Sequence, residues 1–589
     1  MSRHWRLPAP VLILSPVGLA ILYLIGCGTT GQTDWFGHLE RHRKTAEQAS
    51  AEPDPQAESA GVRDTVATVA WVEGLRRMSV GGYGLVVGLG KNGTKQCPKP
   101  IRDYMLSEMR SRYRLGGDYE ELKHLAPEKL IDSEETAPVV VYGEIPAAVQ
   151  KGARFDLTVC ALDGTDTRSL EGGWLMPCSL KLWSGGAPIE GRVLGEGSGQ
   201  VFINPFGLRE GSATRTDPRT GRVIGGGRTN QPRRIRLVLT EPSAAIASRL
   251  MYLINQRFGV EPDKTADAIS PSTVDLRVPP QWQGREAHFL DLLLHLYVPA
   301  APSFSDLRLR ELSEEAVKPD AALNDISLAW EGLGKTSLPH LRKLYTHPTP
   351  AVSYFAARAG VRLGDDLALE VLARHAKDAK TPYREAAVEE IGRATDLSRA
   401  VSILRPLLDV DDHRIRQLAY EGLRRHGDPA VKTIRVGDRG FTVDVVPTNA
   451  RHLITARRSG EQRITLFGTG LCCQKPTFYS HHGDRVLITA DGNASHLTVV
   501  RRTPLTGRWS TPVHAPFDVL GLIQALGRDP TRNARGQYEG LGLTYSQVVE
   551  VLHDLCANKV IDATFVLQEI ESAETLATPP DAGRPESEL

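Results

Sequence analysis

Residues 88–93 read Gly-Leu-Gly-Lys-Asn-Gly, a formal G-x-G-x-x-G pattern of the kind that holds the pyrophosphate of a dinucleotide. That chemistry needs a strand before the glycines and a helix directly after them, because the helix N-terminus attracts the phosphate charge. Residues 85–87 suit a strand, but Pro98 and Pro100 oppose a helix that starts at the loop. A P-loop also fails, since Asn92 stands where Ser or Thr should bind magnesium. We therefore interpret the glycines as parts of a tight turn and predict no cofactor.

The most ligand-like cluster is His481 and His482 with Asp484. Neighbouring residues of a strand point to opposite faces, and no third ligand has a suitable spacing, so we predict a solvated turn and no metal. No G-x-S-x-G motif is present, and no serine or cysteine has neighbours that predict activation. The sequence therefore predicts no catalytic residues and a chain that is not an enzyme.

A basic stretch between residues 221 and 236 is the strongest candidate contact for an anionic partner, although a solvated loop is the default interpretation. Its arginines are Arg222, Arg228, Arg233, Arg234 and Arg236. The whole chain of 589 residues carries 71 basic and 70 acidic residues, a formal charge of +1. No global field therefore attracts nucleic acid, and we predict no nucleic-acid partner.

The N-terminus has the layout of a secretory signal. A basic start at residues 3–6 precedes an apolar stretch over residues 11–25, which is interrupted by Pro16. It ends in Leu-Ile-Gly-Cys, which resembles the bacterial lipobox, in which the cysteine is acylated. We therefore expect a signal peptide over residues 1–27 and lipidation of Cys27. The alternative is an uncleaved anchor helix with an incidental cysteine.

Six further cysteines remain, and an exported chain permits disulfides. Cys160 with Cys178 is a candidate bridge, although connectivity cannot be deduced from spacing alone. Adjacent Cys472 and Cys473 cannot bond each other without strain. Buried, unpaired thiols are the alternative.

Differences in composition and hydrophobic pattern divide the rest of the chain into segments. Residues 28–66 and 571–589 are polar and read as a disordered tether and a disordered tail. Between them, residues 67–300 mix strand and helix patterns, with strands expected at 139–144, 155–159, 235–239 and 274–278. Helices are expected from about residue 242 to Gly259 and around residues 289–293.

Strand signals vanish between residues 321 and 430, and a repeated motif takes their place. Ala-Trp-Glu-Gly-Leu at 329–333 recurs as Ala-Arg-Ala-Gly-Val at 357–361 and as Ala-Tyr-Glu-Gly-Leu at 419–423, with a related segment at 388–392. This spacing is typical of an α-solenoid, and the units resemble HEAT repeats. Because such helices bury their apolar faces on one another, we expect the segment to fold alone and to be removable.

Strand patterns return over residues 434–512, which we expect to form a small β-rich module. Two amphipathic helices are expected near residues 517–526 and 545–558, within a closing segment over residues 513–570. The predicted fold class is therefore multidomain α+β, with a mixed core, inserted helical repeats, a β-rich module and closing helices.

Several segments in the same order resemble the flagellar basal-body P-ring protein family. Residues 80–89, Val-Gly-Gly-Tyr-Gly-Leu-Val-Val-Gly-Leu, are similar to a stretch near the start of the mature family proteins. Residues 139–162, 169–176 and 237–259 resemble further family segments, and residues 518–561 look like the closing helices. The resemblance implies a P-ring-like core over residues 67–300. The lipobox and the helical repeats depart from the family pattern.

The resemblance implies a structural subunit that self-associates into a ring around the flagellar rod in the periplasm. Its implied partners are further copies of the chain and rod and L-ring proteins, and the repeats would offer a surface to another protein. Gly28 after Cys27 favours an anchor in the outer membrane. The alternative is a non-flagellar envelope lipoprotein that uses the same core and repeats as an adaptor. An exported hydrolase is the weakest of the three hypotheses.

Overall fold

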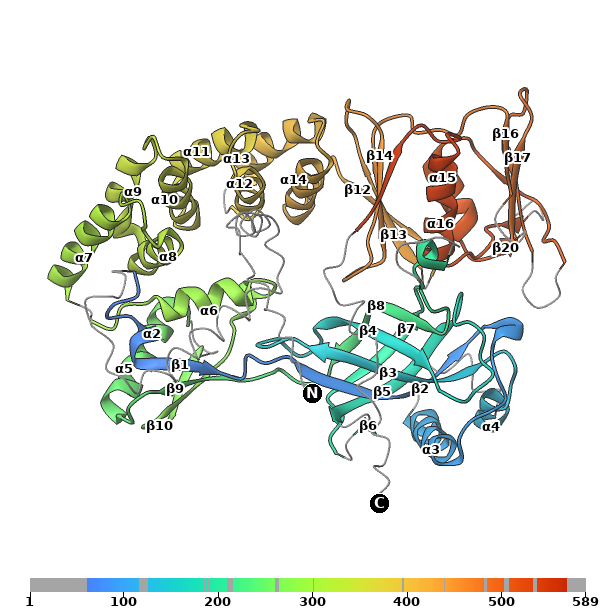
Figure 1. Ribbon diagram of the computed structural model, residues 1–589, viewed down its shortest axis with the longest axis horizontal. Coiled ribbons are helices and arrows are strands. Elements are labelled where there is room, and N and C mark those ends of the chain that lie inside the picture. The colour runs from blue at the N-terminus through green and yellow to red at the C-terminus, as the bar shows by residue number, and fades with distance from the viewer. Residues whose placement is uncertain are drawn as a thin grey trace, which may run out of the picture. The chain divides into compact units, whose positions relative to one another are not determined.

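The structure is a computed structural model that describes residues 61–568 apart from short gaps. The gaps are 116–125, 185–186, 189–190, 209–215, 260–263, 300, 395–396, 439, 481–484, 503–507 and 533–537. The described residues form a mixture of helices and several β-sheets (Figure 1), as the α+β prediction requires. Within these residues, no helix has both the length and the apolar character needed to cross a membrane.

A small four-stranded sheet opens the ordered chain and draws its strands from both ends of the 67–300 region. Its order is β1-β9-β11-β10, with β1 Ala70–Glu73, β9 Ile235–Leu239, β10 Ala266–Ser270 and β11 Thr273–Leu276. Helices α5 (Ala244–Phe258) and α6 (Glu286–Leu294) follow β9 and β11. The predicted strands at 235–239 and 274–278 and both predicted helices are therefore confirmed.

A second sheet is closed into a barrel. Its strands are β2 Met78–Val87, β3 Ala137–Ile145, β4 Arg154–Ala161, β5 Trp174–Ser184, β7 Gly195–Gln200 and β8 Thr220–Thr229. The order is β2-β3-β4-β8-β7-β5, and β2 also pairs with β5. The interior is filled by alternating apolar residues such as Val139, Leu157 and Val159, so the period-2 pattern predicted both β3 and β4.

A helix that the sequence did not predict lies between β2 and β3. Helix α3 spans Lys99–Leu115 and packs Met105, Leu106 and Met109 against Leu85. Its second residue is Pro100. Proline suits the first turn of a helix, where its missing N–H would have no partner anyway, so these prolines mark the start of the helix.

A run of helices follows residue 301. The helices are α7 Pro302–Glu315, α8 Leu323–Leu333, α9 Leu338–Leu344, α10 Pro350–Arg362, α11 Asp366–Lys377, α12 Arg384–Ile391, α13 Leu397–Leu404 and α14 His413–Arg425 (Figure 1). The repeated motif falls on alternate members of this run, α8, α10, α12 and α14. Its first positions, Ala329, Ala357, Val388 and Ala419, are all fully buried.

The recurring glycine of the motif marks places where helices approach closely. A Cβ added at Gly422 would lie 2.9 Å from the Cα of Gly392, and one at Gly360 would collide with the hydroxyl of Tyr345. Side-chain contacts follow the same repeat. Arg362, at the end of α10, forms ion pairs with Glu331 on α8, one motif earlier, and with Glu390 on α12, one motif later. These regularities support the HEAT-like interpretation, which remains a prediction.

Asp365 and Asp412 each precede a helix of this run, but their carboxylates have different partners. Asp412 accepts backbone N–H bonds at the start of α14, as a cap does. Asp365 precedes α11, but its carboxylate accepts hydrogen bonds from the guanidinium of Arg342 and the hydroxyl of Tyr345. The charge of Arg342, which lies on α9, therefore neutralises a buried carboxylate between helices.

The helical run is joined to its neighbours at both ends. Its hydrophobic core continues into Tyr297 on one side and into Val446, Leu453 and Phe467 of the following sheet on the other. The hydroxyl of Tyr420 on α14 also donates a hydrogen bond to the fully buried Asp444 of that sheet. The helices therefore also bury apolar side chains on their neighbours, which opposes the expectation that the segment folds alone and is removable.

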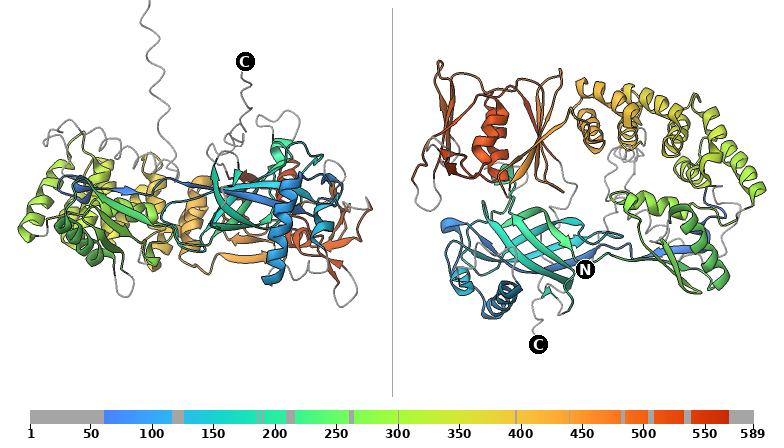
Figure 2. Two further views of the ribbon diagram at one scale, coloured as in Figure 1. Left: turned by 90° about the horizontal axis from the view of Figure 1, so that it is seen from below. Right: turned by 180° about the vertical axis from the view of Figure 1, so that it is seen from behind.

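The C-terminal part contains two sheets with two helices between them (Figures 1 and 2). One sheet has the order β12-β13-β15-β14-β22 and the other β16-β17-β18-β19. Helices α15 (Val519–Gly527) and α16 (Tyr545–Ala557) share one hydrophobic core with both sheets. The predicted helices are present, but the boundary expected near residue 512 divides a single core. The strands are β12 Lys432–Val436, β13 Phe441–Val446, β14 Leu453–Ala456, β15 Arg463–Phe467, β16 Thr477–Ser480, β17 Val486–Ala490, β18 Leu497–Arg501, β19 Val513–Ala515 and β22 Thr564–Leu567.

The predicted tether ends earlier than residue 66. Asp64 forms an ion pair with Arg308, Thr65 pairs with Tyr297, and Val66 is fully buried. Residues 61–66 therefore belong to the folded part of the chain. The expected tail over residues 571–589 lies outside the described residues, as does the rest of the tether.

The Arg362–Glu390 pair gives a testable acid sensitivity. Burial would raise the pKa of the Glu390 carboxyl, but the charge of Arg362 outweighs burial and lowers this pKa to about 2. A pKa below that of the unfolded chain stabilises the fold above about pH 4.5 and ceases to do so as the pH falls toward 2. We expect Glu390→Gln to lower the free energy of unfolding at pH 7 by about 3 kcal/mol and to flatten its decline between pH 5 and 3.

Urea denaturation at pH 7, 5 and 3 measures this effect. Glu389→Gln is the matched control, because Glu389 is adjacent, pairs with Arg393 and is partly exposed. It should cost less than about 1 kcal/mol. Equal losses in the two variants would show that the buried pair does not govern acid stability.

Candidate functional site: the glycine-rich strand and its cavity

The glycines of β2 allow the barrel to close. A Cβ added at Gly82 would lie 2.3 Å from the backbone oxygen of Ser179 on β5, and one at Gly81 would lie 2.3 Å from the ring of Trp183. Real Cβ atoms do not approach other atoms so closely, so only glycine fits at these positions without a shift of the neighbouring strand. The Gly-Gly-Tyr-Gly run is thus a strand whose missing side chains let β5 approach.

The loop after β2 uses its backbone N–H groups internally. The N–H groups of Leu89, Gly93 and Thr94 donate to carbonyls of the 134–136 segment, and that of Asn92 donates to Leu89. A phosphate cradle needs such groups to be free and to point toward the ligand. Helix α3 begins only at Lys99, so the loop does not open a helix either. The structure therefore supports the interpretation of a tight turn.

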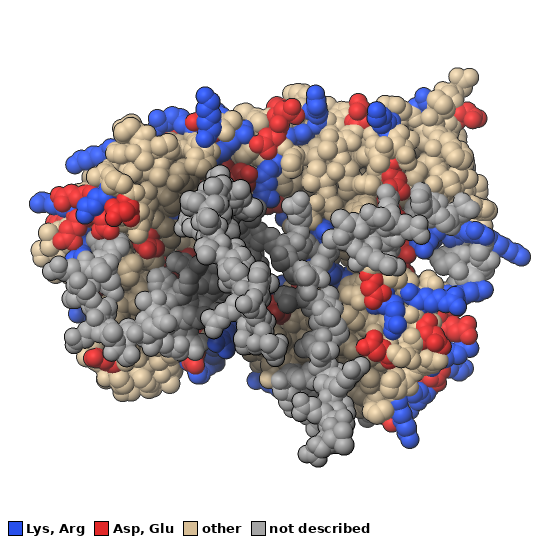
Figure 3. Space-filling model, in the orientation of Figure 1, with Lys and Arg blue, Asp and Glu red and all other residues tan. Residues whose placement is uncertain are grey.

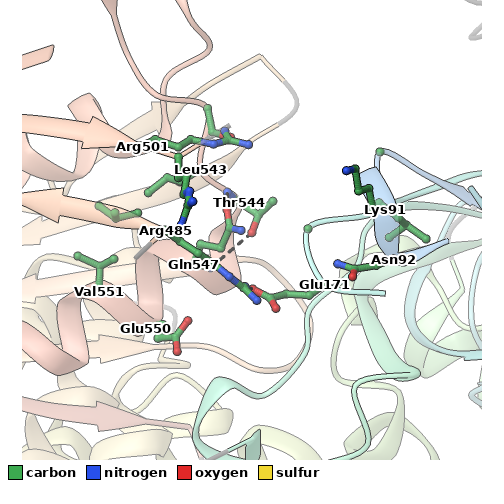
Figure 4. A pocket seen from close by; sticks show the side chains of 16 residues that line it. Lys91, Asn92, Glu171, Arg485, Arg501, Leu543, Thr544, Gln547, Glu550 and Val551 are labelled. Atoms are coloured by element: carbon green, nitrogen blue, oxygen red, sulfur yellow. Dashed lines mark hydrogen bonds and ion pairs between the residues drawn. The ribbon is translucent and has the colours of Figure 1, made fainter. Parts of the chain in front are cut away.

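A cavity of about 340 Å³ lies beside this loop (Figure 4). One side is formed by the loop itself and by the turn at Glu171 and Gly172. The other side comes from the start of β17, the end of β18 and the first turns of α16. The lining residues that carry charge are Lys91, Glu171, Arg485, Arg501, Arg502 and Glu550.

The carboxylate of Asp156 joins the barrel to the C-terminal sheets. Asp156 on β4 forms an ion pair with Arg222 at 3.0 Å and accepts a hydrogen bond from the N–H of Gly225 at 2.7 Å. It also accepts hydrogen bonds from the hydroxyl of Ser459 and the N–H of Gly460, which lie in the turn between β14 and β15. Asp156 thus binds two segments that lie far apart in the chain, an arrangement that the alternation of β4 gives no means of predicting.

Helix α16 is fixed to the barrel by its first turn. The N–H of Tyr545 donates a hydrogen bond to the side-chain oxygen of Gln200, and the Ser546 hydroxyl donates to the carbonyl of Ile203. The rings of Phe202 and Tyr545 lie 5.8 Å apart. The barrel and the C-terminal module are therefore held together by buried polar and aromatic contacts.

The candidate disulfide between Cys160 and Cys178 is not formed, and both thiols are free. Cys160 lies on β4, with its sulfur near the hydroxyls of Tyr142 and Thr220, whereas Cys178 lies on β5 and contacts the carbonyl of Gly197. Two other strands separate β4 from β5 along the sheet in either direction. The prediction of a bridge is therefore wrong, because the two side chains occupy separate strands and different surroundings.

The basic stretch at 221–236 is not a solvated loop. Arg222 lies on β8, and Arg236 on β9 pairs with Asp275 at 2.9 Å. Arg233 donates to the carbonyls of Ile145 and Arg76. Lys, Arg, Asp and Glu side chains are interspersed on the face seen in Figure 3, without a large area of one sign. Most of these arginines therefore have structural partners.

Two predicted features fall outside the described residues. Cys27, the expected lipidated residue, lies in the N-terminal part, and His481, His482 and Asp484 lie in one of the short gaps. Among the described residues, no group of three or more His, Cys, Asp or Glu side chains is arranged to hold a metal ion.

Comparison with known proteins gives a family for the first half of the described chain. Residues 65–304 match the model of the flagellar P-ring protein family. The chain is similar to flagellar P-ring protein 1 of Bradyrhizobium diazoefficiens, with 32% identity over 251 residues that cover 41% of this chain and 62% of that relative. It is also similar to the flagellar P-ring protein of Rhodopseudomonas palustris, with 30% identity over 251 residues and the same coverage.

The chain thus spans less than two thirds of the length of these curated relatives. The family match contains the small sheet and the whole barrel, including the glycine-rich strand and Asp156. The resemblance of residues 518–561 to the family's closing helices lies outside the match and stays a prediction. The chain therefore carries, in residues 65–304, a domain of the flagellar P-ring protein family.

Proposed function

We propose that the chain is a structural subunit of a flagellar P-ring-like assembly, which surrounds the rod in the cell envelope and forms by self-association. The match of residues 65–304 to the P-ring family carries this proposal. The proteins of that family are structural components of the flagellum and not enzymes, which agrees with the absence of a catalytic motif in the sequence.

A ring requires each copy to present two different, complementary faces, because head-to-tail contacts close only when the rotation between copies does. We propose that strands of the family domain supply these faces. The covalent lipid on Cys27 would hold the ring in the periplasm at the outer membrane, since an acyl chain gains free energy for each CH₂ that it buries. Rod and L-ring proteins would be the neighbours, and the HEAT-like helices would offer a surface to one further protein.

Electron microscopy of basal bodies tests this function. Cells that lack the chain should have rods without the ring and should not swim, and expression of the intact chain from a plasmid should restore both. A Cys27→Ser variant expressed in the same way tests the lipid anchor separately. Without the anchor, a smaller fraction of basal bodies should carry the ring. Complete rings and normal swimming in cells without the chain would contradict the flagellar function.

A second function is favoured by the size of the unmatched part. Residues 305–568 contain the helical run and the C-terminal module, and these share cores with the family domain. Such a structure also suits an envelope lipoprotein that uses the P-ring-like domain as part of an adaptor without a role in motility. Cells that lack the chain also distinguish the two functions, because the loss of an adaptor would leave the basal body intact.

A further inference from the structure

The cavity beside the glycine loop brings together charged side chains from distant parts of the chain. Lys91 comes from the loop after β2, Arg485 directly precedes β17, Arg501 ends β18, and Glu550 comes from α16. A volume of about 340 Å³ lies within the range of about 300–1,000 Å³ that small-molecule sites occupy. The cavity is therefore large enough for a compact ligand.

Some of these charges neutralise one another. Arg485 forms an ion pair with Glu171, and Glu550 adds to the negative potential at the same guanidinium. Lys91 and Arg501 are different. Among the residues that the structure describes, no carboxylate lies within ion-pair distance of the ammonium of Lys91 or the guanidinium of Arg501.

These two cations face each other. Figure 4 shows the charged ends of Lys91 and Arg501 directed toward one another from opposite sides of the cavity. Like charges repel, and the partly buried guanidinium of Arg501 loses some of its hydration without a carboxylate in contact. An anion between the two would remove both unfavourable effects.

Arg501 is held in this position by the backbone. One of its terminal nitrogens donates to the carbonyls of Leu541 at 2.7 Å and Gly542 at 3.0 Å. Burial lowers the pKa of its guanidinium, yet arginine keeps its charge at any physiological pH. Two neutral carbonyls orient the group without cancelling its charge, so the remaining edge of the planar guanidinium stays available to a ligand.

The chemistry of the cavity favours a carboxylate over a phosphate. Phosphate sites usually rely on free backbone N–H groups, and four of those in the loop are bonded to carbonyls, namely the N–H groups of Leu89, Asn92, Gly93 and Thr94. A guanidinium instead matches a carboxylate with two parallel hydrogen bonds, and an ammonium opposite supplies a second point of attraction. A ligand with two carboxylates, or with one carboxylate and a polar tail, fits this arrangement.

We propose that this cavity binds a small carboxylate-bearing ligand of the size of an acidic dipeptide, with Arg501 and Lys91 as its two cationic contacts. The ligand lies between the glycine loop and the first turns of α16, so it joins the barrel to the C-terminal module. The proposal does not depend on ring assembly, since every contact comes from one chain.

Isothermal titration calorimetry on the full-length, detergent-solubilised protein tests the site. The probes are glutarate and N-acetyl-Glu-Glu, with neutral glutaramide and inorganic phosphate for comparison. We expect both carboxylates to bind and the other two probes to bind at least tenfold more weakly. Lys91→Gln should weaken carboxylate binding about tenfold or more, as expected for the loss of a charged contact. Lys335→Gln, at an exposed lysine on the helical run, should leave it unchanged.

Arg501→Gln should abolish binding, and because it also removes two hydrogen bonds to carbonyls, its thermal unfolding is measured alongside. If that variant does not fold, Lys91→Gln decides the matter, since Lys91 is exposed and forms no such bonds. Three results would each overturn the proposal: no carboxylate binding, phosphate binding as tight as that of glutarate, or unchanged affinity in Lys91→Gln.

Discussion

A variant that lacks residues 321–430 is expected to be insoluble or to lose its cooperative thermal unfolding. The deletion removes α8 to α14 and uncovers side chains on both sides, including Tyr297 before the helices and Val446, Leu453 and Phe467 after them. Each apolar side chain that loses its burial costs roughly 1.5–3 kcal/mol, and a whole domain is stable by only about 5–15 kcal/mol. Solubility and circular dichroism during heating measure the outcome.

The deletion also separates buried charges. Asp444 loses its hydrogen bond from Tyr420 and its ion pair with Arg424, at 3.2 Å, and is left in the neighbouring sheet with Arg463. At the other end, His288 of α6, whose pKa is lowered by burial, loses its 2.8 Å hydrogen bond with Glu331. A buried charge that loses part of its neutralisation destabilises the part of the protein that remains.

A matched pair of point variants tests the same junction without a deletion. Phe467 is fully buried and its ring contacts that of Tyr420 on α14, whereas Phe478, on β16, is 73% exposed. Phe467→Ala should lower the free energy of unfolding by about 3–5 kcal/mol, and Phe478→Ala should have little effect on it.

The deletion of residues 321–430 has an outcome that would contradict this view. A deletion variant that remains soluble and melts with the intact protein's C-terminal transition would show that the helices are accessory, as their repeat pattern first suggested.

Sequence patterns predicted the helices and strands that bury one face and expose the other. The alternation at residues 155–159 gives β4, whose odd residues Phe155, Leu157 and Val159 fill the barrel. The repeat motif gave the alternate helices α8, α10 and α14, because its small residues lie where helices touch. Such patterns are local, since each residue's face follows from the geometry of its own element.

Features that depend on distant partners were missed. Strand β22 is short, its residues are all partly or fully exposed, and it forms because β14, from much earlier in the chain, accepts it as a parallel neighbour. The β2–β5 pairing that closes the barrel has the same origin. Neither the separation of Cys160 from Cys178 nor the independence expected of the helical repeats could be judged before these pairings and shared cores were known.

The candidate site likewise combines a feature that the sequence predicted with one that it did not. The sequence correctly indicated that no α-helix starts directly after Gly93, since α3 begins only at Lys99. It gave no indication that Lys91 would face Arg501 across a cavity, since the two lie in distant parts of the sequence and neither belongs to a motif. Charged residues on isolated strand ends look like solvated side chains until the fold brings them together.

Gly82→Ala is expected to destabilise the barrel, although alanine is ordinarily tolerated in a strand better than glycine. The new Cβ would lie 2.3 Å from the backbone oxygen of Ser179, and a backbone atom of a paired strand cannot turn aside as a flexible side chain can. Strand β5 would have to move away from β2, which disrupts the pairing that closes the barrel. Overpacking of this kind costs typically about 1–3 kcal/mol, and we expect about 3 kcal/mol here.

Gly492→Ala is the control for this prediction, because a Cβ at Gly492 meets no atom within 4 Å and its φ is not positive. Thermal unfolding followed by near-ultraviolet circular dichroism should show an early transition in Gly82→Ala and a profile like that of the unchanged protein in Gly492→Ala. Under the proposed function, basal bodies from cells that carry Gly82→Ala should also lack the ring, since the barrel lies within the residues that match the P-ring family. If Gly82→Ala unfolds at the same temperature as the unchanged protein, β2 has room for a side chain. The glycines would then need an explanation other than the close approach of β5.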